Sequence, residues 1–513
     1  MLFRSLRLAL VADRDKHIGR WGVAQHKVKR VRSQAASKRS VVRSPAPGEQ
    51  HASPVRHPPG DLQRTQPSRL RSDSERGETA RHECVYTMPR TMGAFERHTL
   101  SNGIRVLTAP MPQAQSVSCI LMFAAGSRYE TPETNGIAHF AEHMFFKGTE
   151  RRQTARDIAG EIDGIGGQMN AFTGKELTGY YIRSAAEHRD IALDVIVDMI
   201  RNSRFEPEEV EREKGVIIEE MNMYIDTPRD YIGSVYESLL FGDQPLGWDI
   251  IGRKETVRAA TRDTFTSYIE DWYSPERMIV GVGGRIGDDL IERLEALLGD
   301  IAPRVTGTAS PVAIAEPASP VRLHTKASDQ AHLIIGTRSY PMDHPDRYAL
   351  DLVTTVLGGG MSSRLFTEVR ERRGLAYYCF GTAHPYTDAG SVYAQAGVDI
   401  TRIDEAVETI VHELRKIAAE PIPTEELEKA RAFTKGRFAL QLESPHATIM
   451  FGLRRETLLG KAEEPDAVVA AVDAVTADDV RRVAQDVLGD SRLLLALMGP
   501  FDDASRFEPL IAA

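Results

Sequence analysis

The segment His139-Phe-Ala-Glu-His143 combines residue types that can hold and use a metal ion. Two histidines four positions apart lie on the same side of a helix, so both imidazoles can reach one ion. Glu142 lies on that side as well, where it could take a proton from a water molecule that the ion activates. The HxxEH order occurs in zinc peptidases. Five residues alone also fit an ordinary solvated helix face, so the metal site needs support from elsewhere in the chain.

That support comes from three segments taken together: HFAEHMFFKGT (139–149), GGQMNAFTGKELTGYY (166–181) and EREKGVIIEEM (211–221). They resemble the inverted-zincin metallopeptidases related to pitrilysin, insulin-degrading enzyme and the mitochondrial processing peptidase β subunit. Within that family, the short bacterial and processing-peptidase-like branch is the most similar. The resemblance covers roughly residues 95–510.

The resemblance implies one Zn²⁺ ion per chain, with His139, His143 and Glu220 as its ligands. Glu142 is then the general base. Glu213, seven positions before Glu220 and on the same helical face, matches a glutamate that supports the ligands. Two imidazoles and one carboxylate leave a fourth position open, which is typical of catalytic rather than structural zinc sites.

The resemblance also implies a substrate-binding strand, which lies between the two metal-binding segments. It matches a family segment that pairs with an extended peptide through main-chain hydrogen bonds, which hold a peptide with little regard to its sequence. The residues concerned are Asn170, Ala171, Phe172 and Thr173.

The segment LGGGMSSRLFTEVRERRGLAYYC (357–379) carries a further implied contribution to the site. Arg370 and Tyr377, seven positions apart, match a family pair that reaches the scissile carbonyl, and a guanidinium and a phenol are suitable donors to an oxyanion. The run Gly358–Gly360 is expected to form a flexible loop with unusual backbone angles.

The order of elements predicts an α+β fold. Strands are expected at 104–107, 118–124 and 179–183, with helices at 185–200 and from Pro207 onward. The region 423–460 parallels 207–242, and 348–357 takes the place of the metal-binding helix but contains no histidine. Together with the resemblance, this predicts two homologous α/β-sandwich halves, each a sheet covered by helices, arranged as a clamshell.

The predicted domains follow from this repeat. Residues 91–302 form a zinc-binding catalytic domain, the Pro-rich segment 303–320 forms a linker, and 321–513 form an inactive repeat of the first domain. Residues 1–90 are a basic, disordered extension, since residues 1–87 contain 18 Lys and Arg against 8 Asp and Glu. This extension is interpreted as the product of a misassigned start, with a mitochondrial transit peptide as the alternative.

Composition bears on whether the protein spans a membrane and on the compartment in which it works. The chain has 513 residues and a net charge of −9, and no run of 18 apolar residues predicts a membrane span. Its three cysteines form no CxxC pair, which favours a reducing compartment such as the bacterial cytoplasm, or the mitochondrial matrix if the extension is a transit peptide. No nucleic-acid partner is expected.

The sequence therefore predicts a zinc-dependent endopeptidase that acts on peptides or extended protein segments, such as presequences. A homodimer, or a heterodimer with a related chain, is the expected assembly. Two alternatives remain open. One is a non-catalytic scaffold subunit of a processing-peptidase-like complex, which typically lacks a ligand or the base, and the other is a zinc-binding chaperone that would need the metal but not Glu142.

Overall fold

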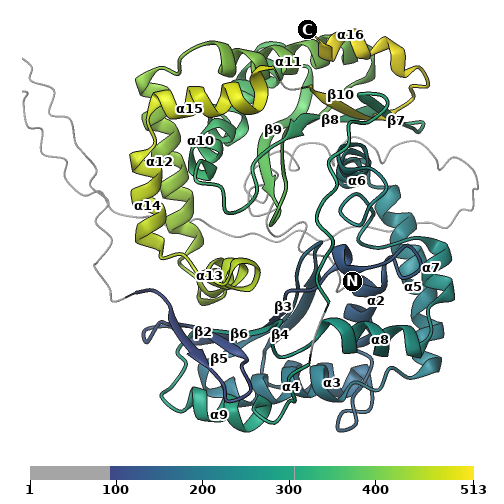
Figure 1. The fold of residues 1–513 in the computed structure, drawn as a ribbon, viewed down its shortest axis with the longest axis vertical. Coiled ribbons are helices and arrows are strands. Elements are labelled where there is room, and N and C mark those ends of the chain that lie inside the picture. Colours follow the sequence, from purple (N-terminus) through teal and green to yellow (C-terminus); the bar gives the residue numbers. More distant parts are fainter. Residues whose placement is uncertain (1–92, 305–306, 491, 513) are drawn as a thin grey trace, which may run out of the picture. The chain divides into compact units, whose positions relative to one another are not determined.

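The computed structural model describes residues 93–304, 307–490 and 492–512, so the predicted extension 1–90 lies outside the described residues. Its first half is built on a mixed six-stranded sheet with the strand order β1-β2-β6-β3-β5-β4 (Figure 1). Only β2 and β6 run parallel, while the other neighbours are antiparallel. The strands are β1 (Glu96–Thr99), β2 (Arg105–Pro110), β3 (Ser116–Phe123), β4 (Gln168–Thr173), β5 (Thr178–Ala185) and β6 (Met278–Gly284).

The second half repeats this sheet without its first strand. Five strands have the order β7-β11-β8-β10-β9, and β7 and β11 are the parallel pair. Strand for strand, the order matches β2-β6-β3-β5-β4, so the predicted internal repeat is confirmed in topology. The strands are β7 (Val321–Thr325), β8 (Gln330–Arg338), β9 (Ala376–Pro385), β10 (Gly390–Asp399) and β11 (Leu494–Gly499).

The helices repeat as well. In the first half they are α2 (Ile137–Met144), α3 (Ala155–Gly164), α4 (Arg189–Asn202), α5 (Pro207–Ile225), α6 (Pro228–Phe241), α7 (Lys254–Ala259), α8 (Arg262–Trp272) and α9 (Leu290–Leu298). In the second half they are α10 (Arg347–Gly358), α11 (Ile403–Ala419), α12 (Thr424–Gln441), α13 (Pro445–Leu459), α14 (Pro465–Ala474), α15 (Ala477–Ala484) and α16 (Glu508–Ala512). The pair α5–α6 corresponds to α12–α13, as the sequence parallel predicts, and α10 follows β8 as α2 follows β3.

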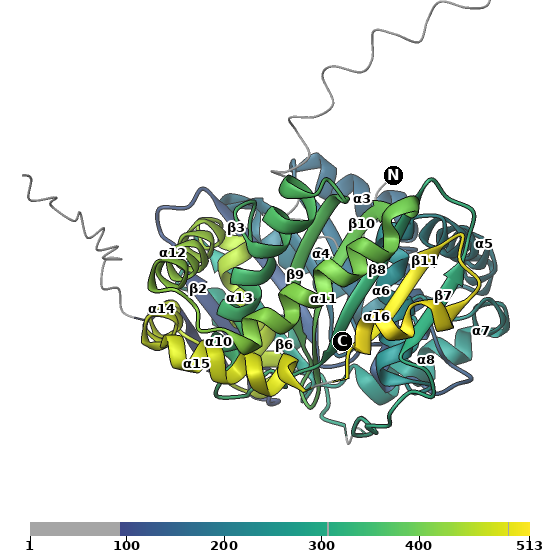
Figure 2. The same cartoon turned by 90° about the horizontal axis from the view of Figure 1, so that it is seen from above.

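The two halves exchange one helix each. Helix α6 of the first half packs against β7, β8 and β11, and α13 of the second half packs against β2, β3 and β6 (Figures 1 and 2). Apolar side chains carry both contacts: Ile232 and Tyr236 of α6 join a buried cluster with Ile334 of the second sheet. On the other side, Ile449 and Leu453 of α13 join one with strands of the first sheet. Both halves accordingly belong to one compact unit.

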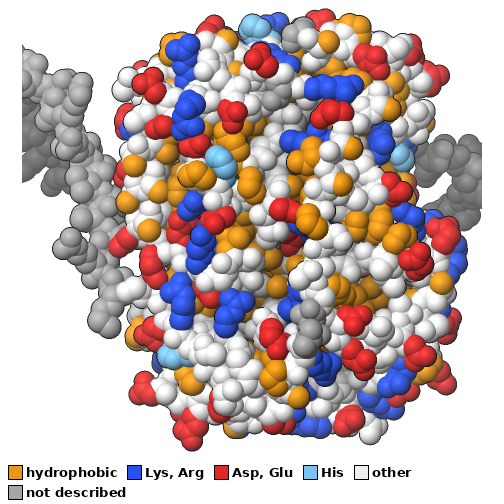
Figure 3. Space-filling view, viewed as in Figure 1, with side chains coloured by type: hydrophobic (Ala, Val, Ile, Leu, Met, Phe, Trp, Pro, Cys, Tyr) orange, Lys and Arg blue, Asp and Glu red, His pale blue; other side chains and the backbone are white. Residues whose placement is uncertain are grey.

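Each sheet buries its other face under its own helices. Helices α2 and α4 contribute to the large core of the first half, and α10 and α11 to that of the second. Each sheet is thus covered on both faces, by its own helices on one and by a helix of the other half on the other. On the face shown in Figure 3, side chains of both charge signs are spread among patches of hydrophobic ones.

The predicted α+β class is confirmed, and two local predictions need correction. The helix expected from Ala185 begins at Arg189, after a short 3-10 turn at Ala186–His188. The run Gly358–Gly360 has no positive backbone φ, and Gly358 is the last residue of α10. Glycine is required there because a Cβ on Gly358 would lie 1.8 Å from the backbone nitrogen of Gly381 in β9. Close packing, and not an unusual turn, explains the glycine.

The cysteines and the length of the apolar helices bear on the predicted class of protein. Cys119 and Cys379 are free and buried. No helix among the described residues is long and apolar enough to cross a membrane.

Candidate metal centre

Helix α2 carries the HxxEH segment and is buried along its whole length. It packs against α5, α8 and the edge strand β4. The apolar residues Phe140, Ala141 and Met144 join the first core, while His139, Glu142 and His143 lie on the remaining side with at most 6% of their surface exposed. A buried helix that places two histidines and a glutamate on one side is suited to a binding site, because polar groups are costly to bury without partners.

Helix α5 brings two carboxylates to this side of α2. Pro207 occupies its first turn, and Glu213 and Glu220 lie two turns apart on the face that meets α2. One Glu220 oxygen lies 3.4 Å from Nε2 of His143 and 3.9 Å from Nε2 of His139. One ligand atom from each of these three residues lies within 4.8 Å of the other two.

These three side chains fit a zinc ion. Ligand atoms about 3.3 Å apart are expected in a tetrahedral zinc site, and the separations involving Glu220 are close to that value. Burial, followed by the nearby His143, lowers the pKa of His139 well below its usual value, which favours the neutral imidazole that binds metals. Burial raises the pKa of Glu220, although the nearby His143 acts in the opposite direction.

A buried hydrogen bond orients one of the two imidazoles. Nδ1 of His143 lies 2.9 Å from Oε1 of Glu213, and Lys147 forms an ion pair with the other Glu213 oxygen. Burial by itself would raise the pKa of Glu213, but the contacts with His143 and Lys147 outweigh it and hold the pKa below its usual value. With its proton on Nδ1, His143 would present the Nε2 lone pair to a metal ion that Glu220 also binds.

His139 lacks such an orienting contact. Its Nδ1 is buried without a hydrogen-bond partner among the described residues. The ring of His139 lies edge-on to that of His143, with 4.7 Å between the ring centres. Its position therefore depends on the placement of helix α2 itself.

Glu142 lies beside the three ligand candidates and contacts the edge strand. Its Oε2 accepts a hydrogen bond of 2.5 Å from the Thr173 hydroxyl, the last residue of β4. Burial raises the pKa of Glu142 to about 7, against the lowering effects of Thr173 and His143. A carboxyl group with a pKa near neutrality is suited to exchanging protons.

Strand β4 is the last strand of the first sheet and pairs only with β5 among the described strands. Its other backbone edge is therefore free to pair with a peptide. The side chains alternate across the sheet: Ala171 joins the core that contains α2, and Phe172 joins the cluster that contains α13. Both are buried, so of the predicted substrate-binding residues these two could contact a peptide only through their main chain.

Arg370 and Tyr377 lie together in the second half, apart from the residues above. The Arg370 guanidinium lies 5.8 Å from the centre of the Tyr377 ring, at the start of β9. Tyr377 is 68% exposed. Within the described residues neither side chain contacts the metal centre, so their predicted role at the scissile bond stays a prediction.

The sequence reading missed two residues that support this centre. Lys147 lies four positions after His143, beyond the end of α2, and pairs with Glu213. Glu130 accepts hydrogen bonds from the backbone at the start of α2. The sequence gave no signal for Glu130, because the irregular segment between it and the helix has no characteristic spacing.

Comparison with known families agrees with this geometry. Residues 105–253 match the family model described as insulinase (peptidase family M16), and residues 259–433 match the peptidase M16 inactive domain. The chain belongs to peptidase family M16. The metal centre lies within the first matched region, and α10, which has no histidine, lies within the second.

Bacterial relatives match this chain over almost their whole length. The uncharacterized zinc protease YmxG of Bacillus subtilis is 37% identical over 408 residues, which are 79% of this chain and 98% of the relative. The uncharacterized zinc protease SCO5738 of Streptomyces coelicolor is 34% identical over 451 residues, or 86% of this chain and 98% of the relative.

Solved structures share the fold at lower sequence identity. A protease from Helicobacter pylori has a TM-score of 0.73 at 22% identity and covers 80% of this chain and 100% of its own. A chain of complex III2 from Candida albicans has a TM-score of 0.71 at 18% identity and covers 82% of this chain and 100% of its own. At these identities the likeness supports the fold alone.

Proposed function

We propose that this M16 family member is a zinc-dependent endopeptidase that hydrolyses peptides or extended, unfolded protein segments. The observation that carries the proposal is the convergence of His139, His143 and Glu220 within 4.8 Å, from two helices, next to a buried glutamate. Two imidazoles and one carboxylate are a ligand set of hydrolytic zinc enzymes. When bound there, zinc would act as a Lewis acid and lower the pKa of a water molecule.

The residues around the centre have separate roles in this proposal. Glu142 takes the proton from the attacking water and returns it to the departing amine. Thr173 holds the Glu142 carboxyl through their 2.5 Å hydrogen bond. Because Thr173 is also the last residue of the edge strand β4, one contact fixes the base relative to the strand on which the substrate is proposed to lie.

An extended peptide is the substrate class that suits the free edge of β4. Pairing with β4 would satisfy the peptide's main-chain groups and continue the antiparallel sheet beyond β5. The buried side chains of Ala171 and Phe172 leave the main chain as the recognised feature of that strand. Most strands of a folded protein are already paired on both sides, so unfolded segments are favoured.

The role proposed for the second half is to supply Arg370 and Tyr377 to the reacting carbonyl. Support comes from their mutual contact and from the exposure of Tyr377, which leaves its hydroxyl accessible to a ligand. A non-catalytic scaffold typically lacks a ligand or the base, whereas each of the three ligand candidates and Glu142 is present in this chain.

The test compares single variants of the full chain for zinc content and peptide cleavage. Glu142→Gln should keep about one zinc per chain and lose hydrolysis of a peptide library. Glu220→Gln should lose zinc, because three protein ligands leave no redundancy. The neighbouring Glu219 is exposed, so Glu219→Gln is the matched control and should change neither property. Wild-type protein that binds zinc but cleaves no peptide would favour the scaffold, and full activity of Glu142→Gln would overturn the proposed mechanism.

A further inference from the structure

The first turn of helix α2 needs hydrogen-bond acceptors that its own sequence does not provide. The helix begins after Gly136, which has a left-handed φ of 97° and no side chain to cap the helix. Ile137 and Ala138 are buried. The N–H groups of a first turn have no partner within the helix, and burying them unpaired costs free energy. His139 is the third residue of this helix, so the same turn carries a metal-ligand candidate.

Glu130 supplies acceptors from outside the helix, while the Ile137 N–H donates to the carbonyl oxygen of Thr134. Its Oε1 accepts a hydrogen bond of 2.8 Å from the Ala138 N–H, and its Oε2 accepts one of 2.8 Å from the Gly136 N–H. Oε2 also accepts a bond of 3.0 Å from the side-chain amide of Asn135. Both carboxyl oxygens are therefore used, and a negative charge beside the N-terminus of a helix is favourable.

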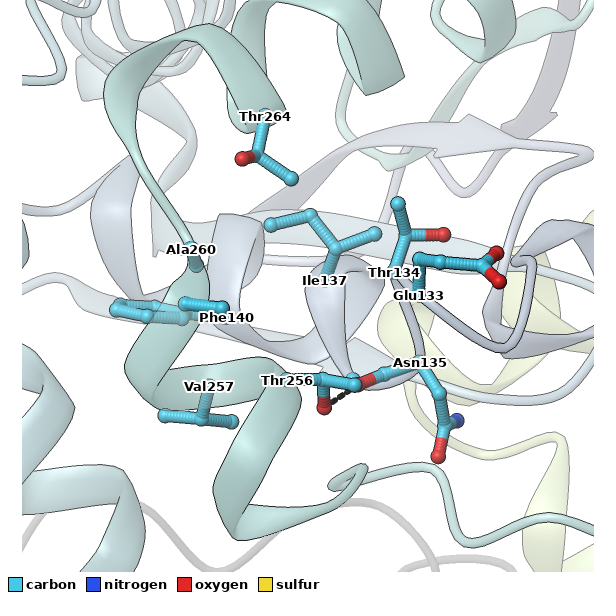
Figure 4. A pocket seen from close by; sticks show the side chains of 11 residues that line it. Glu133, Thr134, Asn135, Ile137, Phe140, Thr256, Val257, Ala260 and Thr264 are labelled. Atoms are coloured by element: carbon cyan, nitrogen blue, oxygen red, sulfur yellow. Dashed lines mark hydrogen bonds between the residues drawn. The ribbon is translucent and has the colours of Figure 1, made fainter.

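The surroundings leave this helix end little freedom to move. A Cβ on Gly136 would lie 2.7 Å from the carbonyl oxygen of Ile251, so the two backbones are in close contact. The carbonyl oxygen of Asn135 accepts a 2.5 Å hydrogen bond from the Thr256 hydroxyl, on the wall of a pocket of about 40 Å³ (Figure 4). Asn135 also donates to the carbonyl oxygen of Asp249.

Glu130 itself is held in an apolar setting. It is 5% exposed, and burial raises its pKa to about 8 although the three N–H donors act in the opposite direction. Placing an acid there is unfavourable unless its hydrogen bonds serve the fold or the site. Two of its bonds end on the backbone of Gly136, which precedes the helix, and of Ala138, the residue before His139.

We propose that Glu130 is a positioning residue of the metal centre: by fixing the first turn of α2, it holds His139 at the point where His143 and Glu220 converge. The proposal rests on the proposed zinc site. It also accounts for the contrast between the two histidines. Glu213 orients His143 directly, whereas His139 has no partner for its Nδ1 and depends on the helix end that Glu130 holds.

The test measures the zinc dissociation constant of the full chain by competition with a chelator at pH 8, together with the melting temperature of the zinc-free protein. Glu130→Gln turns one acceptor into a donor that faces N–H groups, so zinc binding should weaken about ten-fold or more, the range known for residues that support metal ligands. Amide exchange in peptides covering 133–145 of the zinc-free variant should be faster than in wild type.

Glu413→Gln is the matched control, since Glu413 is a buried acid of the second half with a raised pKa. It should leave the zinc dissociation constant and exchange in 133–145 unchanged. If Glu130→Gln does not fold, Asn135→Ala removes one of the three donors to Glu130, together with the bond to Asp249, and should weaken zinc binding in the same direction by a smaller factor.

The results distinguish a positioning role of Glu130 from a purely structural role and from the absence of a zinc site. A lower melting temperature for Glu130→Gln with an unchanged zinc dissociation constant would show a purely structural role and overturn the inference. Unchanged zinc binding in Asn135→Ala, when Glu130→Gln cannot be folded, would overturn it too. Wild-type protein without measurable zinc binding would instead refute the proposed zinc site itself.

Discussion

At the scale of single residues, the metal centre depends on a chain of buried charges behind the ligands. Lys147 pairs with Glu213, and Glu213 contacts Nδ1 of His143, whose other nitrogen faces Glu220. Side-chain exposures of 2% for His143 and 3% for Glu213 mean that water cannot replace a lost contact. Removing one member of such a chain leaves the next unpaired, which is more costly than the contact itself is worth.

Substitution of Glu213 by glutamine should therefore weaken zinc binding by about 10–100-fold. The amide cannot balance Lys147 and holds the His143 tautomer less firmly. Chelator competition on the full chain measures the effect. The control is Glu211→Gln, on the same helix: Glu211 is 69% exposed and pairs with Lys214 at 2.6 Å. Equal zinc affinities of the two variants would contradict the supporting role of Glu213.

Tyr377 offers a second test at this scale, since it lies in the half without the metal centre. Tyr377→Phe removes one exposed hydroxyl and should leave folding and zinc content intact. If the hydroxyl donates to the oxyanion, kcat should fall by about 10²–10³-fold with little change in KM.

The next residue provides the comparison for that experiment. The Tyr378 hydroxyl lies 2.9 Å from Nδ1 of His332, on the opposite face of the strand. Tyr378→Phe should lower the melting temperature and leave kcat unchanged. Full activity of Tyr377→Phe and of Arg370→Ala would show that the second half does not act on the carbonyl.

At the scale of elements, α13 places a histidine of the second half against the first sheet. Nδ1 of His446 lies 2.9 Å from the Ser118 hydroxyl of β3, and its ring lies 4.5 Å from that of Tyr181 in β5. Burial, and then the positive charge of Arg183, lowers the pKa of His446 to about 4. Protonating His446 therefore opposes the docking of α13 on the sheet.

Stability should consequently decrease in mildly acidic solution. The unfolded chain protonates His446 near its usual pKa of 6.5, and the folded chain only near 4. Between these values the unfolded chain binds more protons, so the free energy of unfolding falls as the pH falls. At pH 5 the loss is at most about 2 kcal/mol.

Urea unfolding at pH 7.5 and at pH 5 measures this effect. In His446→Gln, which cannot take up the proton, the decrease between the two pH values should be smaller by about that amount. His412→Gln, at an exposed position of α11, should behave as wild type. An equal decrease in His446→Gln and wild type would show that His446 does not limit acid stability.

At the scale of the whole molecule, the two equivalent hairpin turns contact each other. Glu176, in the turn between β4 and β5, accepts hydrogen bonds from the backbone and hydroxyl of Thr387, in the turn between β9 and β10. Arg128 binds Glu176 at 2.6 Å and Asp388 at 2.5 Å, and it also donates to the carbonyl oxygen of Ser310. The turns that end both edge strands are thus joined through the buried charges of Arg128 and Glu176 and the exposed carboxylate of Asp388.

The exchanged helices add an apolar connection between the halves. Ile449 and Leu453 are fully buried against strands of the first sheet, and Ile232 is fully buried against the second. The halves should therefore stay associated after the segment between them is cut. A protease site inserted after Ile314, which is 68% exposed, tests this: both fragments should elute together in gel filtration. Two separate peaks would contradict it, and the uncut protein gives the reference volume.

The sequence alone predicted what depends on residue type and local spacing. His139 and His143 are four positions apart, and Glu213 and Glu220 seven apart, so any helix places each pair on one face. The repeat of α5–α6 in α12–α13 was predicted for the same reason, because apolar periodicity and Pro-bounded turns are local properties. Similarity to family M16 joined these pieces into one site.

Only the tertiary structure decided which surfaces meet. The apolar residues of α13 could pack on either sheet, and nothing in their periodicity indicates that they cover the first one. Gly358 looked like a loop residue because its close neighbour, Gly381, is distant in sequence. Glu130 binds the N–H groups at the start of α2 across an irregular segment of the chain. These bonds stabilise the helix because burial removes the water that would otherwise bind those N–H groups. Contacts between distant segments are set by packing, and spacing along the chain does not encode them.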